Sequence, residues 1–304
     1  MLKMSVKIKY ALPLIVLIVS QTAFAKDLKD LQSSEQWSGY LEGFGGLVID
    51  GKETWYKGSS SEEEWFGNQF GISGHISRQL DNSFSTQIDA LAETQSNDYK
   101  SARATDTWRS YGSGIHGNYK ISETLSFGVI GSLGTVNSLS NGDSSYSDYG
   151  NIGVETVYQT GSYRLYAQIG DAFAFSGVDG GHDAKDFYGA IIASYYFNPN
   201  LALSGNMVID RYTADGTNNS NNLGFDTNYG VRLDYKPEKS PLSFFADFSI
   251  SQWRGEYDLG QGTFKGDNKY ILIGAIMPFG ITTIKEQHEK VGLLDLNPMF
   301  GQFD

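Results

Sequence analysis

The sequence predicts an all-β protein: a single transmembrane, antiparallel, up-and-down β-barrel of about twelve strands, with short periplasmic turns and long extracellular loops. Three observations support this fold class. Twelve segments alternate apolar and polar residues, the connections between them alternate between short and long, and aromatic residues gather at both ends of the segments. Strands cross a bilayer only as a closed barrel, because an open sheet edge would leave backbone groups unpaired in lipid.

The first 25 residues have the features of a cleaved secretory signal. Lys3, Lys7 and Lys9 precede an apolar run at 11–19, and the run is followed by Ala23-Phe24-Ala25. The run is too short to span a bilayer. We therefore expect cleavage near Ala25, export, and a periplasmic N-terminal segment at 26–36.

The composition agrees with an exported barrel. Loss of the three signal lysines takes the formal net charge from −12 to −15, which argues against a nucleic-acid partner. The chain has no cysteine, so its fold does not depend on disulfides. The mean hydropathy of −0.32 is compatible with a membrane barrel, since only alternate strand positions need to face lipid.

The strands follow a period of two. The clearest example has Tyr229, Val231 and Leu233 on one face and Arg232 and Asp234 on the other. The predicted strands lie at 37–49, 70–79, 84–93, 108–119, 125–133, 148–158, 163–173, 187–197, 201–210, 226–235, 243–251 and 270–279. A soluble β-sandwich also has alternating strands, but it does not explain twelve strands with aromatic residues at both ends.

The connections between these strands alternate in predicted length. The long ones are rich in Gly, Ser, Asn and Asp and lie at 50–64, 95–107, 137–147, 176–185, 214–224 and 255–266. The short ones lie at 80–83, 122–123, 160–162, 198–200 and 237–240. Since every short connection falls between two long ones, the long ones should all lie on the extracellular side.

Aromatic residues near the strand ends predict a girdle at each bilayer interface. Beside the short turns lie Tyr40, Phe84, Tyr119, Tyr158, Tyr163, Phe197, Tyr235, Phe244 and Phe279. Beside the long connections lie Trp65, Trp108, Tyr111, Tyr149, Phe173, Phe187, Tyr212, Phe225, Trp253 and Tyr270.

The last predicted strand resembles the assembly signal of Gram-negative outer-membrane β-barrels, with Gly274, Met277 and Phe279 at the characteristic positions. The resemblance covers essentially all of the mature chain and implies a porin-like barrel at 37–280 in the outer membrane. Its implied partners are outer-membrane lipid, lipopolysaccharide and the barrel-assembly machinery. Unlike the family pattern, Leu272 occupies a usually polar position and a tail follows the aromatic residue. This tail, at 281–304, is expected in the periplasm, where it either plugs the barrel, docks a partner or stays disordered.

Nine inward positions are candidates for lining the lumen: Glu42, His75, Gln87, Asp89, Glu93, Glu155, Arg232, Asp234 and Asp247. Carboxylates outnumber bases among them, so an open path should favour cations or neutral solutes. The sequence thus predicts a channel for passive diffusion of small polar solutes. A twelve-stranded barrel can equally be filled, and a pairing of Arg232 with Asp234 and Asp226 would favour that. The alternative is then a structural or adhesive surface protein.

Enzymatic and metal-dependent functions receive less support, and no cofactor is expected. His75 and Ser77 share a strand face, as a lipid hydrolase would require, but they face inward and the sequence names no third residue to orient the histidine. His116 lies in a glycine-rich strand and carries no catalytic pattern. The acidic groups at Asp179, His182, Asp183 and Asp186 and at 62–64 lack the spacing of a calcium loop.

Overall fold

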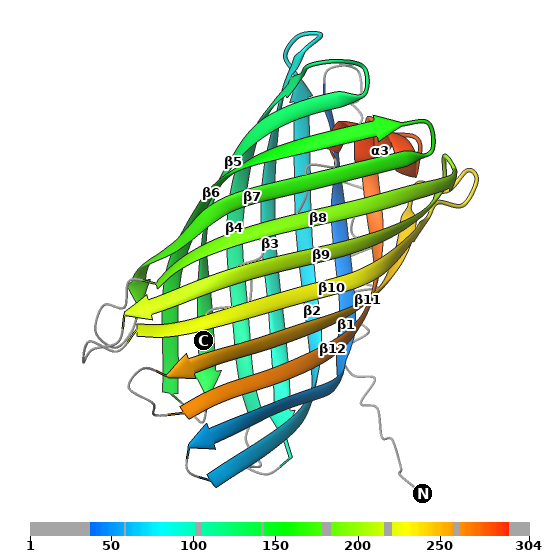
Figure 1. Ribbon diagram of the computed structural model, residues 1–304. Coiled ribbons are helices and arrows are strands. Elements are labelled where there is room, and N and C mark those ends of the chain that lie inside the picture. The colour runs from blue at the N-terminus through cyan, green and yellow to red at the C-terminus, as the bar shows by residue number, and fades with distance from the viewer. Residues whose placement is uncertain are drawn as a thin grey trace, which may run out of the picture.

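A computed structural model describes residues 37–57, 59–100, 105–140, 143–177, 184–215, 221–257 and 262–291. They form a closed barrel of twelve strands in which each strand pairs with its sequence neighbours and β1 pairs with β12 (Figure 1). The strands are β1 (Trp37–Lys57), β2 (Ser59–Gln79), β3 (Phe84–Tyr99), β4 (Thr105–Lys120), β5 (Leu125–Ser140), β6 (Asp143–Thr160), β7 (Tyr163–Gly177), β8 (Ala184–Asn198), β9 (Leu201–Asp215), β10 (Asn221–Tyr235), β11 (Ser243–Tyr257) and β12 (Gly262–Phe279). All twelve pairings are antiparallel, which confirms the predicted fold class.

The alternation of the sequence becomes an apolar outside and a polar inside. Ile88, Val129 and Val231 on the outer face are each at least half exposed, whereas Gln87 and Asp234 point inward and are buried. In a globular protein, exposed apolar side chains on this scale would mark a contact surface, and here they form a band suited to lipid. None of the helices within the described ranges is both long and apolar enough to cross a membrane.

The connections differ from the prediction. The segments predicted as long loops are largely strand: β1 runs to Lys57 and β2 starts at Ser59, inside the predicted loop at 50–64. Likewise β5 ends at Ser140 and β6 begins at Asp143. Strands of 15 to 21 residues exceed the 9–11 residues that cross a bilayer. Outside lipid, the extra residues pair their backbone groups as ladders without needing an apolar face, so their composition resembled that of loops.

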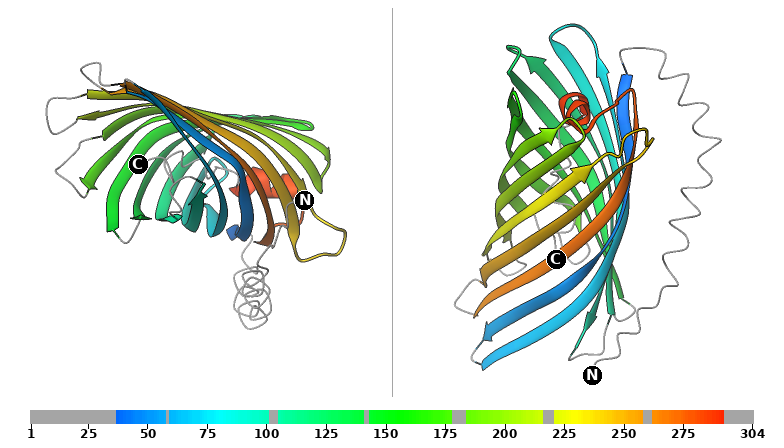
Figure 2. Two further views of the ribbon diagram at one scale, coloured as in Figure 1. Left: turned by 90° about the horizontal axis from the view of Figure 1, so that it is seen from below. Right: turned by 90° about the vertical axis from the view of Figure 1, so that its right-hand side faces the viewer.

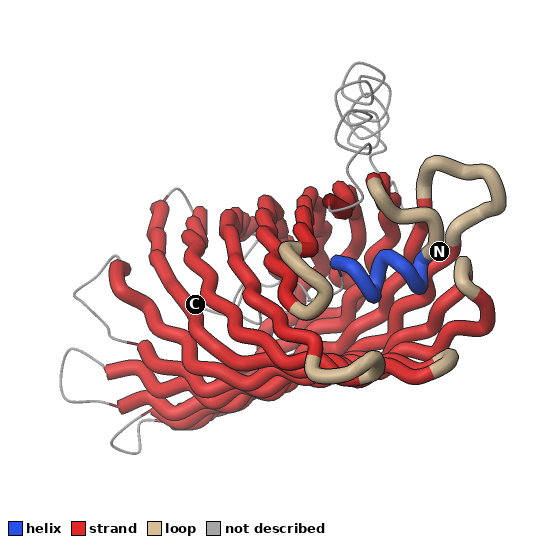
Figure 3. The backbone as a smooth tube through the Cα atoms, turned by 90° about the horizontal axis from the view of Figure 1, so that it is seen from above, coloured by secondary structure: helices blue, strands red, loops and turns tan. Residues whose placement is uncertain are grey.

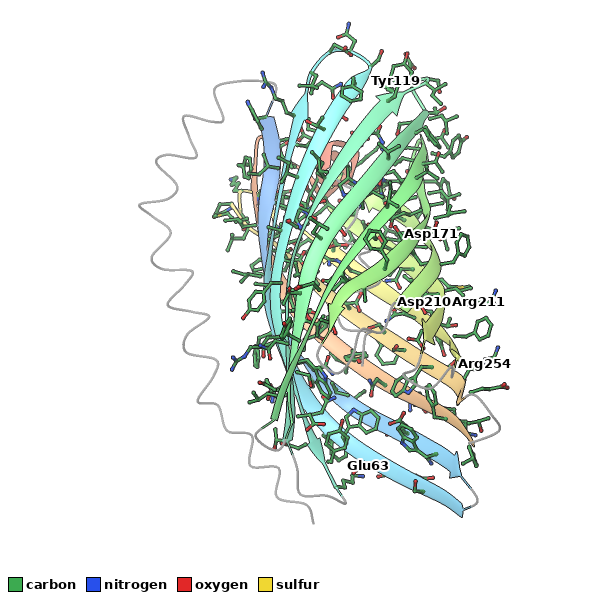
Figure 4. All side chains as sticks on the ribbon, turned by 90° about the vertical axis from the view of Figure 1, so that its left-hand side faces the viewer. Glu63, Tyr119, Asp171, Asp210, Arg211 and Arg254 are labelled. Atoms are coloured by element: carbon green, nitrogen blue, oxygen red, sulfur yellow. The ribbon has the colours of Figure 1, made fainter. Side chains whose placement is uncertain are left out.

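Several aromatic residues predicted for the girdles instead point into the barrel. Tyr119, Tyr163 and Phe187 are exposed on the outer face as expected, and Figure 4 shows Tyr119 near one end and Glu63 near the other. The inward ones share strand parity with inward polar residues and are mostly buried or half-buried: Tyr40, Trp65, Trp108, Tyr149, Trp253 and Tyr270. Phe279 lies at the end of β12 but is buried, and the side chain of Tyr212 lies outside the described residues.

Glycines on neighbouring strands make room for these inward rings. A Cβ atom on Gly71 would lie 2.2 Å from the ring of Phe44, and one on Gly51 would lie 2.2 Å from the indole of Trp65. The same close approach occurs at Gly134 under Tyr149, Gly266 under Trp253 and Gly274 under Phe245. At these five positions glycine therefore serves ring packing against the barrel wall rather than a turn.

A short helix, α3 (Ile284–Val291), follows β12 and lies at the end of the barrel that carries the short turns. The chain reverses at Gly280, whose φ of 64° is a left-handed conformation that suits glycine. Figures 2 and 3 show the tilted strands as a ring, with α3 set against its inner side. Residues 1–36 and 292–304 lie outside the described residues, so the signal and most of the tail are not described. The barrel strands begin at Trp37 and end at Phe279.

Candidate functional site

All nine candidate lumen residues lie at inward-facing positions, and most of them sit toward the short-turn end. Seven of the nine lie three to five residues from the end of their strand on the short-turn side, as with His75 before Gln79 and Arg232 before Tyr235. Asp234 lies one residue from that end and Glu93 nine residues. They form two groups, one centred on His75, Asp89 and Glu155, the other on Arg232.

The first group is a continuous chain of hydrogen bonds along the inner wall, here called the histidine chain: Ser73, His75, Asp89, His116, Glu155 and Tyr166. His75 Nδ1 lies 2.7 Å from Asp89 Oδ1, and Asp89 Oδ2 lies 2.6 Å from His116 Nε2. His116 Nδ1 lies 3.0 Å from Glu155. The members of the histidine chain come from five strands, β2, β3, β4, β6 and β7, and they are buried or nearly so.

Both ends of the histidine chain are held by further groups. The phenolic hydroxyl of Tyr166 donates to Glu155 Oε2 at 2.8 Å. At the other end the ring of Tyr40 packs on His75 with 4.3 Å between centroids. Gln87 donates to Asp89 Oδ1 at 2.8 Å. Because each charged member has a partner, burial of this chain is compatible with a stable barrel.

The histidine chain contains a serine, but not the one expected from sequence. His75 Nε2 lies 3.1 Å from Ser73 Oγ, and Asp89 supplies the orienting carboxylate that the sequence did not name. Ser73 is paired across the sheet with Glu42, whose carboxylate binds Arg232. Ser73 and His75 are buried on the inner side of the wall, so lipids of the surrounding bilayer do not reach them.

The second group holds a guanidinium ion between two carboxylates. Arg232 donates to Glu42 Oε2 at 2.8 Å and to Asp234 Oδ1 at 2.9 Å, and its guanidinium carbon lies 3.7 Å from the ring centre of Phe245. The sequence suggested Asp226 as a second partner for Arg232, but Asp226 lies six residues away along β10. Its backbone amide donates a hydrogen bond to the Asp210 carboxylate on β9 at 3.2 Å. Since β10 and β1 are not adjacent, the Arg232–Glu42 contact spans the curved wall.

The interior has an accessible side and a packed side. Six inward side chains on β3 and β10–β12 are half-buried, although others on these strands, such as Gln87 and Asp234, are buried. The six are Leu91, Glu93, Asn228, Asp247, Ser249 and Leu272. Those on β7–β9 are buried: Gln168, Tyr188, Ala190, Ile192, Ser204 and Val208. Glu93 accepts a hydrogen bond from Gln69 at 3.0 Å on the accessible side. The half-buried inward side chains named here therefore lie on β3 and β10–β12.

The predicted assembly-signal residues also have contacts of their own. Gly274 lies under the ring of Phe245, and the Phe279 ring lies over Gly39 of β1. Gly274 and Met277 pair with Phe44 and Leu41 along the seam between β12 and β1. These positions therefore contribute to barrel closure.

The acidic surface groups form ion pairs where they are described. Lys52 contacts Glu62 at 2.8 Å, and Lys100 pairs with Glu64. Among the described residues no group of three or more potential ligands could hold a metal ion. Asp179, His182 and Asp183, and the side chain of Asp186, lie outside them.

Sequence reasoning missed Ser73, Tyr166 and Arg164 and gave His116 no role. Arg164 is buried inside β7, 5.7 Å from the ring centre of Tyr166. Its parity with Tyr166 and Gln168 was a usable signal for an inward position. The contact between His116 and Glu155 had no sequence signal, because β5 lies between their strands.

Comparison with known proteins shows the fold. No family model matches the chain, and no curated protein matches it. An outer-membrane channel from Pseudomonas putida F1 has a TM-score of 0.52 at 11% identity, covering 80% of this chain and 95% of the other. The translocator domain of the autotransporter NalP from Neisseria meningitidis has a TM-score of 0.49 at 10% identity, covering 86% of this chain and 96% of the other. The toluene transporter TodX of Pseudomonas putida has a TM-score of 0.41 at 12% identity, covering 83% of this chain and 91% of the other. The chain therefore has the fold of Gram-negative outer-membrane β-barrels, as the resemblance at its last strand implied.

Proposed function

We propose that the protein is an outer-membrane channel for small polar solutes, with a preference for cations or neutral molecules, and not an enzyme. The observation that carries this proposal is the accessible interior side along β3 and β10–β12, where Glu93, Asn228, Asp247 and Ser249 are half-buried. A barrel that served only as a scaffold would have no need to keep polar inward side chains accessible.

The charge of the lumen supports the selectivity. The inward carboxylates among the described residues include Glu42, Asp89, Glu93, Glu155, Asp210, Asp226, Asp234 and Asp247, against the two guanidinium groups of Arg164 and Arg232. A low-dielectric wall strengthens the field of such an excess, so anions are disfavoured along the path.

The location of the protein is part of the same proposal. It includes export by the signal at 1–25, contact with outer-membrane lipid and lipopolysaccharide, and insertion by the barrel-assembly machinery. The outward apolar band and the lengths of the strands support it.

Conductance of the mature protein in planar bilayers tests the proposal. We expect discrete steps and a reversal potential of cationic sign in a KCl gradient, reduced by Asp247→Asn. Glu256→Gln on the same strand is the matched control, because Glu256 is exposed beyond the lumen side chains. Silence under all conditions would overturn the channel, and an unchanged reversal potential in Asp247→Asn would remove Asp247 from the path.

A second candidate function, adhesion, is favoured by the hairpin of β1 and β2. These strands extend well past the bilayer span and expose Trp55 and Tyr56 beside Glu62. Such aromatic residues often anchor protein contacts. Loss of cell-surface binding in a Trp55→Ala, Tyr56→Ala variant that still conducts would add adhesion to the channel.

A further inference from the structure

Helix α3 is docked at the mouth of the lumen by an apolar contact. Ile284 is fully buried against Tyr196 of β8 and Ala202 of β9. Ile281, just before the helix, joins the inward cluster of Tyr40, Phe44, Phe245 and Ile276. The segment therefore contacts both sides of the barrel seam and the wall beyond it.

Polar contacts tie the same helix to two short turns. The backbone amide of Lys285 donates to the Pro199 carbonyl at 3.0 Å, and its ammonium group donates to the Gly161 carbonyl at 2.9 Å. Gln159 donates to Glu289. Because these bonds reach the β6–β7 and β8–β9 turns while α3 also lies against β1 and β2, the helix crosses part of the mouth.

The helix has an N-cap residue, but it is too short to be stable without docking. Thr283 Oγ1 accepts a hydrogen bond from the Glu286 amide at 3.1 Å, as an N-cap residue does. An eight-residue helix is marginal by itself, so its stability depends on docking. Ile281 and Ile284 supply the main buried apolar contacts in the described part of the tail.

One docking contact involves a titratable group. His288 Nδ1 lies 3.0 Å from the Tyr196 hydroxyl, within hydrogen-bond distance, and the two ring centroids lie 5.7 Å apart. The neutral imidazole accepts from the hydroxyl or donates to it, according to its tautomer, whereas the protonated imidazole only donates. Protonation of His288 therefore fixes Nδ1 as a donor and places a positive charge on a partly buried residue at the mouth of the lumen.

We propose that α3 is a gate, which narrows the short-turn mouth of the lumen while docked and is released by acidification through protonation of His288. This inference rests on the proposed channel function and adds its regulation. Opening would require the helix to leave the wall, with Ile284 moving out of the pocket formed by Tyr196 and Ala202.

The charges around His288 fix the direction of the pH effect. Burial lowers the pKa of His288 to about 4, with Arg164 and Arg232 acting in the same direction and Asp234 against them. Other strands also place inward residues on this side of the barrel: Tyr40 and Glu42 on β1, His75 on β2, and Ala202 and Ser204 on β9. Glu289 lies on α3 itself.

Docking is therefore strongest above the ordinary histidine pKa of 6.5 and weakens as pH falls toward 4, because the released helix binds the proton more tightly. A pKa difference of 2.5 corresponds to an upper limit of about 300-fold in the docking equilibrium. His288 is only partly buried, so we expect a change in the docking equilibrium of about ten-fold to a hundred-fold.

A reversible cross-link tests the gate in the intact mature protein. The chain has no cysteine, so Ala202→Cys with Ile284→Cys introduces a single pair across the docked helix. Oxidation should form the bridge, detected by mass spectrometry, and should suppress conductance until reductant is added. The control pair is Ser194→Cys with Ser204→Cys, whose hydroxyls lie 2.8 Å apart between β8 and β9 without involving α3.

The pH arm uses His288→Asn, which keeps an acceptor for Tyr196 but does not titrate. Wild-type open probability should rise about six-fold to twenty-fold between pH 7 and pH 5, and this rise should be lost in His288→Asn. A bridge that forms without changing conductance would overturn the gate and leave the channel standing, and failure of the bridge to form would overturn docking. Equal pH dependence in both proteins would overturn the role of His288. Silence of the reduced protein at pH 5, with docking shown by the bridge, would overturn the channel itself.

Discussion

Replacement of Arg232 by methionine should be among the most destabilising single changes in the lumen. Arg232 is bonded to Glu42 at 2.8 Å and to Asp234 at 2.9 Å, and Asp234 is almost fully buried. Removal of the guanidinium leaves two inward carboxylates without their counterion. Breaking a buried ion pair in this way costs about 3–5 kcal/mol. Since 27% of the Arg232 side chain is exposed, we expect the lower end of that range, about 3 kcal/mol.

The free energy of unfolding in lipid vesicles, measured by urea titration with tryptophan fluorescence, provides the assay. Arg254→Met is the control, because Arg254 is exposed and its guanidinium carbon lies 5.6 Å from the ring centre of Phe225. The double variant Arg232→Met, Glu42→Gln should recover part of the loss, since one of the two stranded charges is then neutral. A loss below about 1 kcal/mol for Arg232→Met, or no recovery in the double variant, would refute the ion-pair reasoning.

Three further predictions concern packing, the histidine chain and the gate. Gly71→Val should lower the free energy of unfolding by about 1–3 kcal/mol, because its Cβ would lie 2.2 Å from the Phe44 ring. Gly43→Val should leave it unchanged, since nothing lies within 4 Å of a Cβ at that position. Thermal unfolding distinguishes the two variants. Glu155→Gln should cost about 2–4 kcal/mol in the same assay by depriving His116 of its buried carboxylate, with the exposed Glu123→Gln unaffected. Thr283→Ala should weaken the α3 cap by about 1 kcal/mol, and single-channel recording should then give an open probability about five-fold higher; an unchanged value would dissociate the cap from gating.

The outer surface of this barrel could be predicted from the sequence, because lipid imposes a strict period of two on outward residues. Tyr229, Val231 and Leu233 are exposed as expected, and Arg232 and Asp234 face inward. The same period also indicates that some of the aromatic residues assigned to the girdles face inward. Trp65 has the parity of His75 and Tyr149 that of Glu155, so both rings belonged inside.

The connections and the interior contacts were harder to predict. Outside lipid a strand needs no apolar face, so the hairpin of β1 and β2 had the composition of a loop. The contact between His116 and Glu155 depends on Gly128 of the intervening strand, where a Cβ would lie 2.7 Å from Glu155 Oε1. Nothing local encodes that relation. Helix α3, by contrast, had a local signal in Thr283 and Glu286, the spacing of a capping box.

The seam between β1 and β12 also determines the order of folding events. Its register joins Gly39 to Phe279, residues 240 apart in the chain, whereas the other pairings join strands that follow each other directly. Closing so long a loop carries the largest entropic cost in the barrel, and contacts of high sequence separation form slowly. Until the seam closes, β1 and β12 present two unpaired edges that can capture other strands. Seam changes such as Gly274→Val should therefore act first on the rate of closure and on aggregation during insertion, before any effect on the completed barrel is seen.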